Sequence, residues 1–204
     1  MLAIEVFPPT DADLAIDFVD WNPAPPDKDM GLWNRAYLTT SGPVELRHPF
    51  VLSKLDLPSL QTAHLTVSAE LRNPTRELIK GTLEGRIEDI HFSQEVELGP
   101  GGSKEVSFTP RSFPQLNISD PRLWWPAQMG APHLYSLEMK FKVDDVISDR
   151  LQTHFGIREV TSEIDQQDSL LFKVNGKRIL IRGAGWAPDM MLRESSQRLE
   201  DEFR

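Results

Sequence analysis

Strict alternation of apolar and polar residues over residues 134–143 constrains the fold of this chain more than any other sequence feature. The apolar side chains occupy every second position: Tyr135, Leu137, Met139, Phe141 and Val143. A period of two places one face of a β-strand on a core and the other face in water. The segment therefore predicts a half-buried strand.

The same alternation recurs upstream, at residues 65–72 and 79–87. Turn-forming residues separate these segments, among them Asn73-Pro74 and Asp144-Asp145. Several such strands at short spacing are typical of an antiparallel β-sandwich. We therefore expect an all-β, immunoglobulin-like sandwich over about residues 47–160.

The overall charge narrows the classes of partner. The chain has 31 Asp and Glu against 22 Lys and Arg, a formal net charge of −9. A nucleic-acid-binding or anionic-membrane-binding surface needs clustered basic residues, so neither partner is expected. The absence of cysteine excludes disulfides and thiolate metal sites. No signal peptide is visible at the start of the sequence, and no apolar run is long enough to span a bilayer.

The first 46 residues have a different pattern. Leu2, Ile4 and Val6 alternate with polar or small residues and predict a short strand. A Pro- and Asp-rich loop follows over residues 8–29, and a second strand-like run covers Trp33–Thr40.

The last third of the chain predicts a hairpin and then a helix. Two apolar runs flank Asn175-Gly176, and both of these residues tolerate the positive φ of a type I′ turn. The second run leads into a glycine-bearing loop, and residues 195–203 have a helical period. A strand, a loop and a helix in this order begin an α/β barrel. We therefore expect a piece of a larger enzyme that stops before the catalytic groups.

Five short motifs occur in an order that resembles glycoside hydrolase family 2: Leu123–Pro126, Pro132–Leu137, Phe155–Glu159, Val174–Lys177 and Ile181–Gly183. The resemblance implies three regions. These are the end of a jelly-roll sugar-binding domain (1–46), an immunoglobulin-like sandwich (47–160), and the entry hairpin and first βα unit of a catalytic (β/α)₈ barrel (161–204).

Within that family, Trp186–Arg193 resembles the exo-β-D-glucosaminidases, which act on chitosan, and the β-mannosidases next. The run Asp20–Asn22 is similar to the same two groups. β-Galactosidases usually carry Asn-Arg-His after the barrel glycine, where this chain has Gly185-Trp186-Ala187, so the resemblance disfavours galactosidase activity. It implies a carbohydrate substrate, no cofactor and an extracellular or periplasmic location.

The resemblance also implies that the catalytic residues lie outside this chain. A retaining glycosidase needs two carboxylic acids about 5–5.5 Å apart, and in this family both are glutamates from the later half of the barrel. Glu194, Glu200 and Glu202 lie on the expected first helix, where a solvated face is the simpler interpretation. Glu159 belongs to the Phe-Gly-x-Arg-Glu stretch, and we expect it to hold the sandwich to the barrel.

Four residues are candidates for substrate binding: Asp20, Trp21, Trp186 and Asp189. Asp20 lies in the loop that, in the resembling enzymes, reaches toward the sugar, and a carboxylate suits hydroxyl groups and the ammonium of glucosamine. Its alternative role is an Asx-turn. Trp21 either stacks on a sugar or anchors the loop. Trp186 and Asp189 follow the expected first barrel strand, although Asp189 could equally cap the helix.

We expect structural roles for two tryptophans and no metal-binding role for the histidines. Adjacent residues on a strand point to opposite faces, so we expect one of Trp124 and Trp125 in the core and the other in interdomain packing. The five histidines have no ligand-like spacing, so no metal site is expected.

Two other classes of protein stay open at this stage. One is a free-standing carbohydrate-binding or adhesive β-sandwich, and the other is an interaction module without enzymatic lineage. For a fragment of a larger enzyme, the two ends have apolar faces without their partners, such as Leu171 and Ile181, so we expect these segments to fold back on the sandwich, to self-associate or to be mobile.

Overall fold

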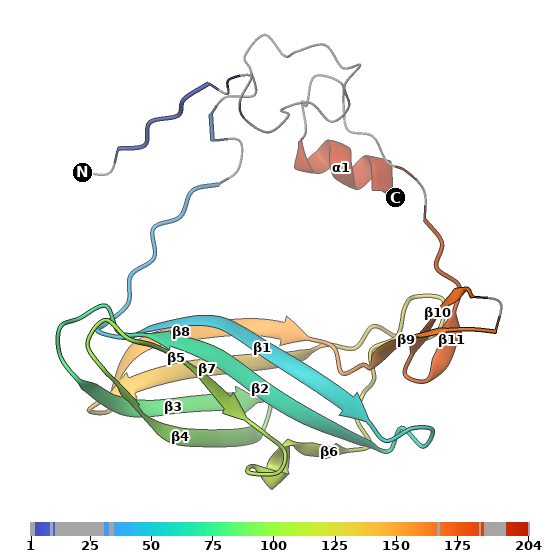
Figure 1. Cartoon of the computed structure of the whole chain (residues 1–204), viewed down its shortest axis with the longest axis horizontal. Coiled ribbons are helices and arrows are strands. Elements are labelled where there is room, and N and C mark those ends of the chain that lie inside the picture. Colours follow the sequence, from blue (N-terminus) through green and yellow to red (C-terminus); the bar gives the residue numbers. More distant parts are fainter. Residues whose placement is uncertain are drawn as a thin grey trace. The chain divides into compact units, whose positions relative to one another are not determined.

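The computed structural model describes residues 3–8, 10, 31–32, 35–166, 168–183, 185 and 195–203 (Figure 1). They belong to two compact units. One is Thr40–Ile181, and the other contains the described residues before Thr40 and after Ile181. The second unit includes the predicted C-terminal helix, α1 (Ser196–Phe203). No helix in the described part of the chain is long and apolar enough to cross a membrane.

The strands predicted near the N-terminus are wrong at the positions that the structure describes. Residues 3–6 and 35–40 form neither strand nor helix. A strand requires hydrogen bonds from a neighbouring strand, and no described strand pairs with either segment. The alternation at residues 3–6 is therefore present without a described partner strand that would convert it into a sheet.

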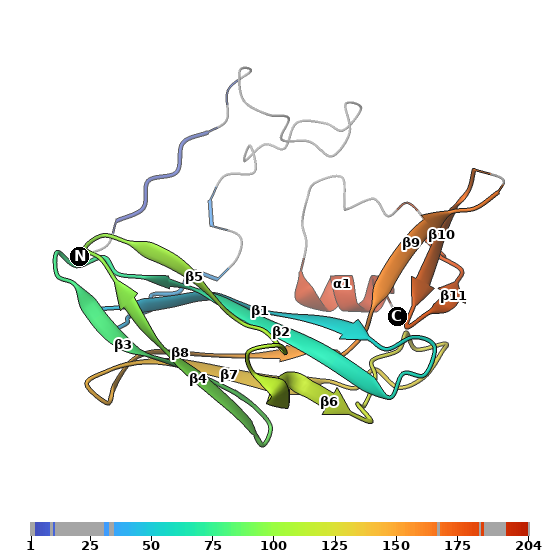
Figure 2. The ribbon, with the colours of Figure 1, turned by 60° about the horizontal axis from the view of Figure 1, so that its bottom comes forward.

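The larger unit contains the predicted sandwich, with all strand pairs antiparallel (Figures 1 and 2). One sheet has the order β1-β2-β5, and a short β6 pairs with the start of β2: β1 (Glu45–Leu55), β2 (Thr62–Arg72), β5 (Ser103–Phe108) and β6 (Asn117–Ser119). The other has the order β4-β3-β7-β8: β3 (Ile79–Ile87), β4 (Ile90–Leu98), β7 (Tyr135–Val143) and β8 (Val146–Phe155). A single 3₁₀ turn, η1 (Pro114–Leu116), joins β5 to β6.

The inner faces of the two sheets form one apolar core. The predicted alternation is confirmed on both sides: Leu65, Val67, Leu71, Leu137, Met139 and Phe141 have no exposed side-chain surface. Gly85 of β3 allows close packing, because the ring of Phe92 occupies the space that a Cβ at this position would fill. Burial of this many large side chains, each stabilising by about 1.5–3 kcal/mol, makes the core the main source of stability.

A third, smaller sheet follows the sandwich with the order β11-β10-β9: β9 (Val160–Ile164), β10 (Leu170–Val174) and β11 (Lys177–Ile179). The predicted hairpin is confirmed. Asn175 has φ 50° and Gly176 has φ 75°, the positive values that a type I′ turn requires. All five residues of β9 are exposed, and Val174 is the buried residue of β10. This sheet therefore has little core of its own.

The expectation that one tryptophan lies in the core is wrong. Trp124 and Trp125 are both half-buried, because their segment forms only isolated bridges, Leu123 with Ile157 and Trp124 with Pro132. Each indole instead lies beneath a cation: the Arg158 guanidinium is 4.1 Å from the Trp124 ring and the Lys177 ammonium is 5.0 Å from the Trp125 ring.

Candidate functional site

The four sequence-predicted substrate residues, Asp20, Trp21, Trp186 and Asp189, all lie outside the described residues. Their placement therefore stays a prediction. The described part of the chain instead shows how the segment that leads toward Trp186 is anchored to the sandwich. It also shows a charged hollow on the sandwich surface that the sequence did not predict.

Asn175 anchors the small sheet through hydrogen bonds. Its backbone N–H donates to the Glu159 carbonyl at 2.8 Å, and its side-chain Oδ1 accepts from the Glu159 N–H at 2.9 Å. Its Nδ2 donates to the Trp124 carbonyl at 3.1 Å. The residue is only 2% exposed. One asparagine thus fixes the hairpin turn to two separate segments of the chain.

Glu159 extends this connection to the edge of the sandwich. Its Oε2 accepts a hydrogen bond from the Leu55 N–H, at the end of β1, at 2.7 Å. Next to it, the Ser53 hydroxyl donates to the Arg158 carbonyl at 2.6 Å and accepts from the Arg158 N–H at 3.1 Å. We call Ser53, Trp124, Arg158, Glu159 and Asn175 the clasp. It joins β1 to the β10–β11 turn. The expected role of Glu159 in holding the sandwich to a barrel stays a prediction.

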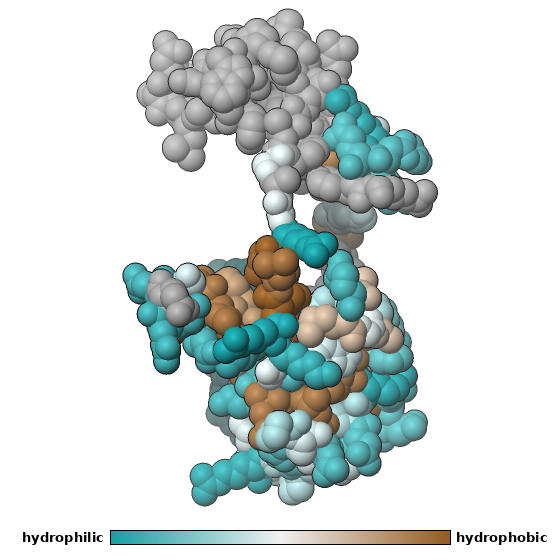
Figure 3. Space-filling view, turned by 90° about the vertical axis from the view of Figure 1, so that its right-hand side faces the viewer, coloured by the Kyte–Doolittle hydropathy of each residue, from teal (hydrophilic) through white to brown (hydrophobic). Residues whose placement is uncertain are grey.

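An open hollow of about 770 Å³ lies beside the clasp, along β1 and the end of β8. Apolar residues that are half exposed or more line it, among them Phe50, Leu134 and Val160. Figure 3 looks at this end of the unit and shows apolar side chains on its surface. The space has few charged groups, so its physical character is that of a packing surface.

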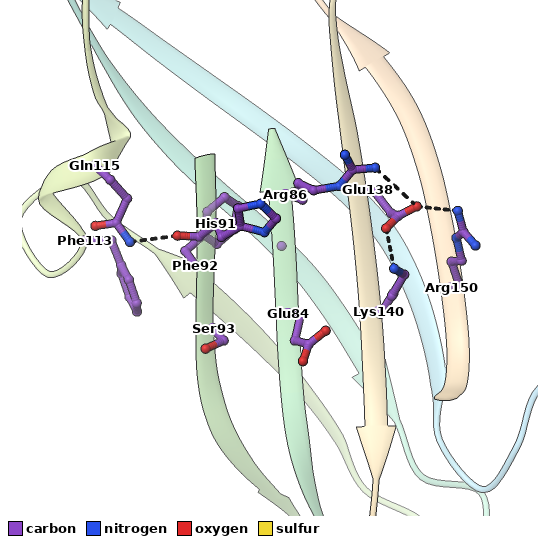
Figure 4. A pocket seen from close by; sticks show the side chains of 11 residues that line it. Glu84, Arg86, His91, Phe92, Ser93, Phe113, Gln115, Glu138, Lys140 and Arg150 are labelled. Carbon is purple, nitrogen blue, oxygen red and sulfur yellow. Dashed lines mark hydrogen bonds and ion pairs between the residues drawn. The ribbon is translucent and has the colours of Figure 1, made fainter. Parts of the chain in front are cut away.

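A second hollow, of about 790 Å³, lies on the outer face of β4, β3, β7 and β8 (Figure 4). Glu138 is one of the lining residues, with a side chain 6% exposed. The Lys140 ammonium lies 2.6 Å from Glu138 Oε1, the Arg150 guanidinium binds Oε2, and Arg86 lies 3.9 Å from Oε2. We call Glu138 and these three cations the Glu138 cluster.

The neighbouring cations favour the deprotonated form of the Glu138 carboxyl. The hydrogen bond from Lys140 and the charges of Lys140 and Arg150 lower the pKa of the Glu138 carboxyl, although its burial acts in the opposite direction. The side chain is therefore a carboxylate at neutral pH. It accepts hydrogen bonds and orients cations, and it is poorly suited to donate a proton to a leaving group.

The sequence did not reveal the roles of two of these residues. Asn175 was recognised only as a turn residue, and its side-chain contacts depend on segments that are 16 and 51 positions away. Glu138 was placed on a solvated face by its parity, which is correct, but its burial comes from the long side chains on neighbouring strands. Within the described residues, no group of three His, Cys, Asp or Glu could hold a metal ion.

Comparison with known proteins identifies the family. The profile of glycosyl hydrolases family 2 matches residues 44–158, from the residue before β1 to the clasp. An exo-β-D-glucosaminidase from Streptomyces avermitilis is 40% identical over 192 residues, which cover 94% of this chain and 21% of that protein. A mannosylglycoprotein endo-β-mannosidase from Lilium longiflorum is 33% identical over 199 residues, covering 91% of this chain and 21% of that protein.

Solved structures agree with the sequence relatives. The crystal structure of an exo-chitosanase from Amycolatopsis orientalis is similar with a TM-score of 0.81 at 34% identity, over 94% of this chain and 22% of that one. The chain therefore spans about a fifth of the length of these relatives. Since the family profile matches more than half of its residues, the chain belongs to glycosyl hydrolase family 2.

Proposed function

We propose that this chain is the non-catalytic β-sandwich region of an enzyme that removes terminal β-D-glucosamine residues from chitosan oligosaccharides. The observation that carries the proposal is the 40% identity to an exo-β-D-glucosaminidase along 94% of the chain. Four further exo-β-D-glucosaminidases are 34–35% identical over at least 93% of the chain. A retaining mechanism with two carboxylic acids would supply the chemistry, and both acids would come from a part of the enzyme beyond this chain.

The protonation of Glu138 supports a non-catalytic role for the sandwich. A glycosidase acid must hold its proton near neutral pH, which requires a raised pKa. Lys140 and Arg150 lower the pKa of Glu138 instead. Glu159, a part-buried carboxylate next to the small sheet, binds the Leu55 N–H.

We further propose the domain layout that the family resemblance implied: residues 1–46 end a sugar-binding domain, 47–160 form the sandwich, and 161–204 begin the barrel. Asp20, Trp21, Trp186 and Asp189 would then contact substrate in the complete enzyme. Asp20 could pair with the ammonium of glucosamine.

Activity measurements would test the proposal. The complete polypeptide should hydrolyse p-nitrophenyl β-D-glucosaminide faster than the β-D-mannoside, and the 204-residue chain alone should hydrolyse neither. β-Mannosidase is the second candidate, because the Lilium relative is 33% identical over 91% of the chain. Preference for the mannoside would select it, and hydrolysis by the chain alone would refute the non-catalytic role.

The role of Asp20 has its own test in the complete enzyme. Asp20→Ala should lower kcat/KM for the glucosaminide and leave the melting temperature nearly unchanged. Full kcat/KM in this variant would assign Asp20 to an Asx-turn instead.

A further inference from the structure

The outer face of the four-stranded sheet carries its polar side chains in an ordered grid. Antiparallel pairing aligns residues of β4, β3, β7 and β8 in two neighbouring rows, His91, Arg86, Glu138 and Gln152 in one, and Ser93, Glu84, Lys140 and Arg150 in the other. Directly opposite residues on one face have Cβ atoms about 4.5–5.5 Å apart. The charged groups of three strands therefore converge on one small area.

Glu138 organises the cations of this grid. Both of its carboxylate oxygens are used, Oε1 by Lys140 and Oε2 by Arg150, and the side chain is nearly inaccessible to water. A ligand that reaches the hollow (Figure 4) would meet two cationic side chains, Lys140 and Arg150, whose positions Glu138 already restricts. Such preorganisation lowers the entropic cost of binding.

The area has more positive than negative charge. Three cationic side chains line the hollow, Arg86, Lys140 and Arg150, against two carboxylates, Glu84 and Glu138. This surplus stands against a formal charge of −9 for the whole chain. A local reversal of the overall sign favours the capture of an anion at that place.

Arg86 has the donors for such a ligand. Its nearest carboxylate oxygen, on Glu138, is 3.9 Å away, beyond hydrogen-bond distance, and its side chain is 49% exposed. A guanidinium presents five N–H donors in a planar fork that matches the oxygens of carboxylates and phosphates. Arg150 on the opposite side of Glu138 is also half exposed.

We propose that this hollow binds a polyvalent oxyanion, a ligand with two or more negative charges on carboxylate or phosphate groups. Arg86 and Arg150 provide the hydrogen bonds, Lys140 adds charge, and Glu138 holds Lys140 and Arg150 in place. This site lies on the outer face of the sandwich and is independent of the proposed sugar hydrolysis. A cationic sugar such as glucosamine has the wrong charge for it.

Calorimetric titration of the 204-residue chain with citrate and, separately, with inorganic phosphate tests the proposal. At least one of the two anions should bind at low ionic strength, and added salt should weaken the binding. Binding of citrate alone assigns the carboxylate class, and binding of phosphate alone assigns the phosphate class. Glucosamine should not bind. Absence of binding by both anions would overturn the proposal.

Two matched variants locate the site. Arg86→Gln removes a cation that forms no short contact with Glu138, so the fold should persist, and the affinity should fall about five-fold or more. Lys80→Gln removes the same charge from the same face of β3, but Lys80 is 72% exposed and pairs with Glu97 outside the hollow. Its affinity should change less than about two-fold.

An equal loss of affinity in Arg86→Gln and Lys80→Gln would mean that the anion responds only to the total charge of this face, and would refute the site. Arg86→Lys provides a second check, because it keeps the charge and loses the fork. Its affinity should lie between those of the unmodified chain and Arg86→Gln. An affinity for Arg86→Lys as low as that of Arg86→Gln, with an unchanged circular dichroism spectrum, would still place the site at Arg86.

Discussion

The sandwich and the small sheet β9–β10–β11 belong to the same compact unit, but different forces stabilise them. The sandwich closes over a continuous apolar core that includes residues of both its sheets. In the small sheet, all residues of β9 are exposed, and the hairpin is attached through the side chains of Asn175 and Glu159. Apolar burial brings two layers together without fixing direction, whereas a set of hydrogen bonds fixes orientation.

This difference has a consequence for function. If the small sheet leads into a barrel, as proposed, the clasp determines the direction in which the chain leaves the sandwich. A core that tolerates repacking could not specify that direction alone. The following predictions test whether the two regions really depend on different interactions.

The largest effect is expected in the core. Leu137→Asp would place an unpaired charge at a position that is 0% exposed, and the free energy of unfolding should fall by roughly 3–5 kcal/mol. Urea denaturation followed by tryptophan fluorescence measures it. Leu134→Asp, at a position 53% exposed just before β7, is the control and should change stability by less than about 0.5 kcal/mol. An unaltered transition for Leu137→Asp would contradict the assigned register.

The next effect concerns the clasp. Asn175→Ala leaves the Glu159 N–H and the Trp124 carbonyl without their partner and puts alanine at φ 50°. The local cost should be about 2–3 kcal/mol. Hydrogen exchange should become faster at the amides of β10 and β11, while the central strands of the sandwich stay protected.

Two variants sharpen this result. Asn175→Gly keeps the tolerance for positive φ, so its difference from Asn175→Ala isolates the backbone term, about 1 kcal/mol. Asn73→Ala is the matched control. Asn73 is equally buried and donates to the Glu77 carbonyl at 2.8 Å within the sandwich. It should disturb the β2–β3 connection and leave β10 exchange unchanged. Equal exchange rates of the β10 amides in Asn175→Ala, Asn175→Gly and Asn73→Ala would show that the clasp does not hold the small sheet.

The sequence predicts the strands of the sandwich better than it predicts the contacts that attach the small sheet. Alternation at 65–72, 79–87 and 134–143 predicted strands and their buried faces, because every second residue of a half-buried strand faces the core and is therefore apolar. The hairpin at Asn175-Gly176 was also predictable, since positive φ restricts the residue types. The segment 3–6 has a similar local pattern without a described partner strand, so the pattern alone was insufficient.

Contacts between distant segments were beyond the reach of sequence reasoning. The Asn175 side chain binds Trp124, and Ser53 binds Arg158, 105 positions away. Neither pairing leaves a periodic signal. Trp124 and Trp125 were misplaced for a related reason: their segment follows irregular backbone, so the rule that adjacent residues face opposite ways did not apply.

A smaller effect is expected in the Glu138 cluster. Glu138→Gln removes the carboxylate between Lys140 and Arg150, but both cations retain contact with water. The loss of stability should be about 1–2 kcal/mol and should decrease in high salt. Glu97→Gln, which affects an exposed pair with Lys80, is the control and should be nearly neutral. A loss for Glu138→Gln as large as that for Leu137→Asp would contradict the view that apolar burial dominates the sandwich.

The smallest effect is a pH dependence at the edge of the sandwich. His64 Nδ1 lies 2.6 Å from Asn117 Oδ1, and its Nε2 lies 3.0 Å from Asp56 Oδ1. The hydrogen bond to Asn117, and next the bond to Asp56, raise the pKa of His64 above its ordinary value. Protonation of both ring nitrogens lets the imidazolium donate to both neighbours. The stabilisation is therefore complete below the ordinary pKa of about 6.5 and is lost as the pH rises through the raised pKa of the folded state.

His64→Gln, which cannot titrate, tests this sign. The melting temperature of the unmodified chain should exceed that of the variant more at about pH 6 than at about pH 9. Comparing the difference between the two proteins cancels the titration of the other histidines. The effect should be small, since the His64 and Asp56 side chains are 35% and 54% exposed and water screens their interaction. A difference that grows with pH would mean that neutral His64 is the stabilising form, and the imidazolium would then have no part in joining β2 to β6.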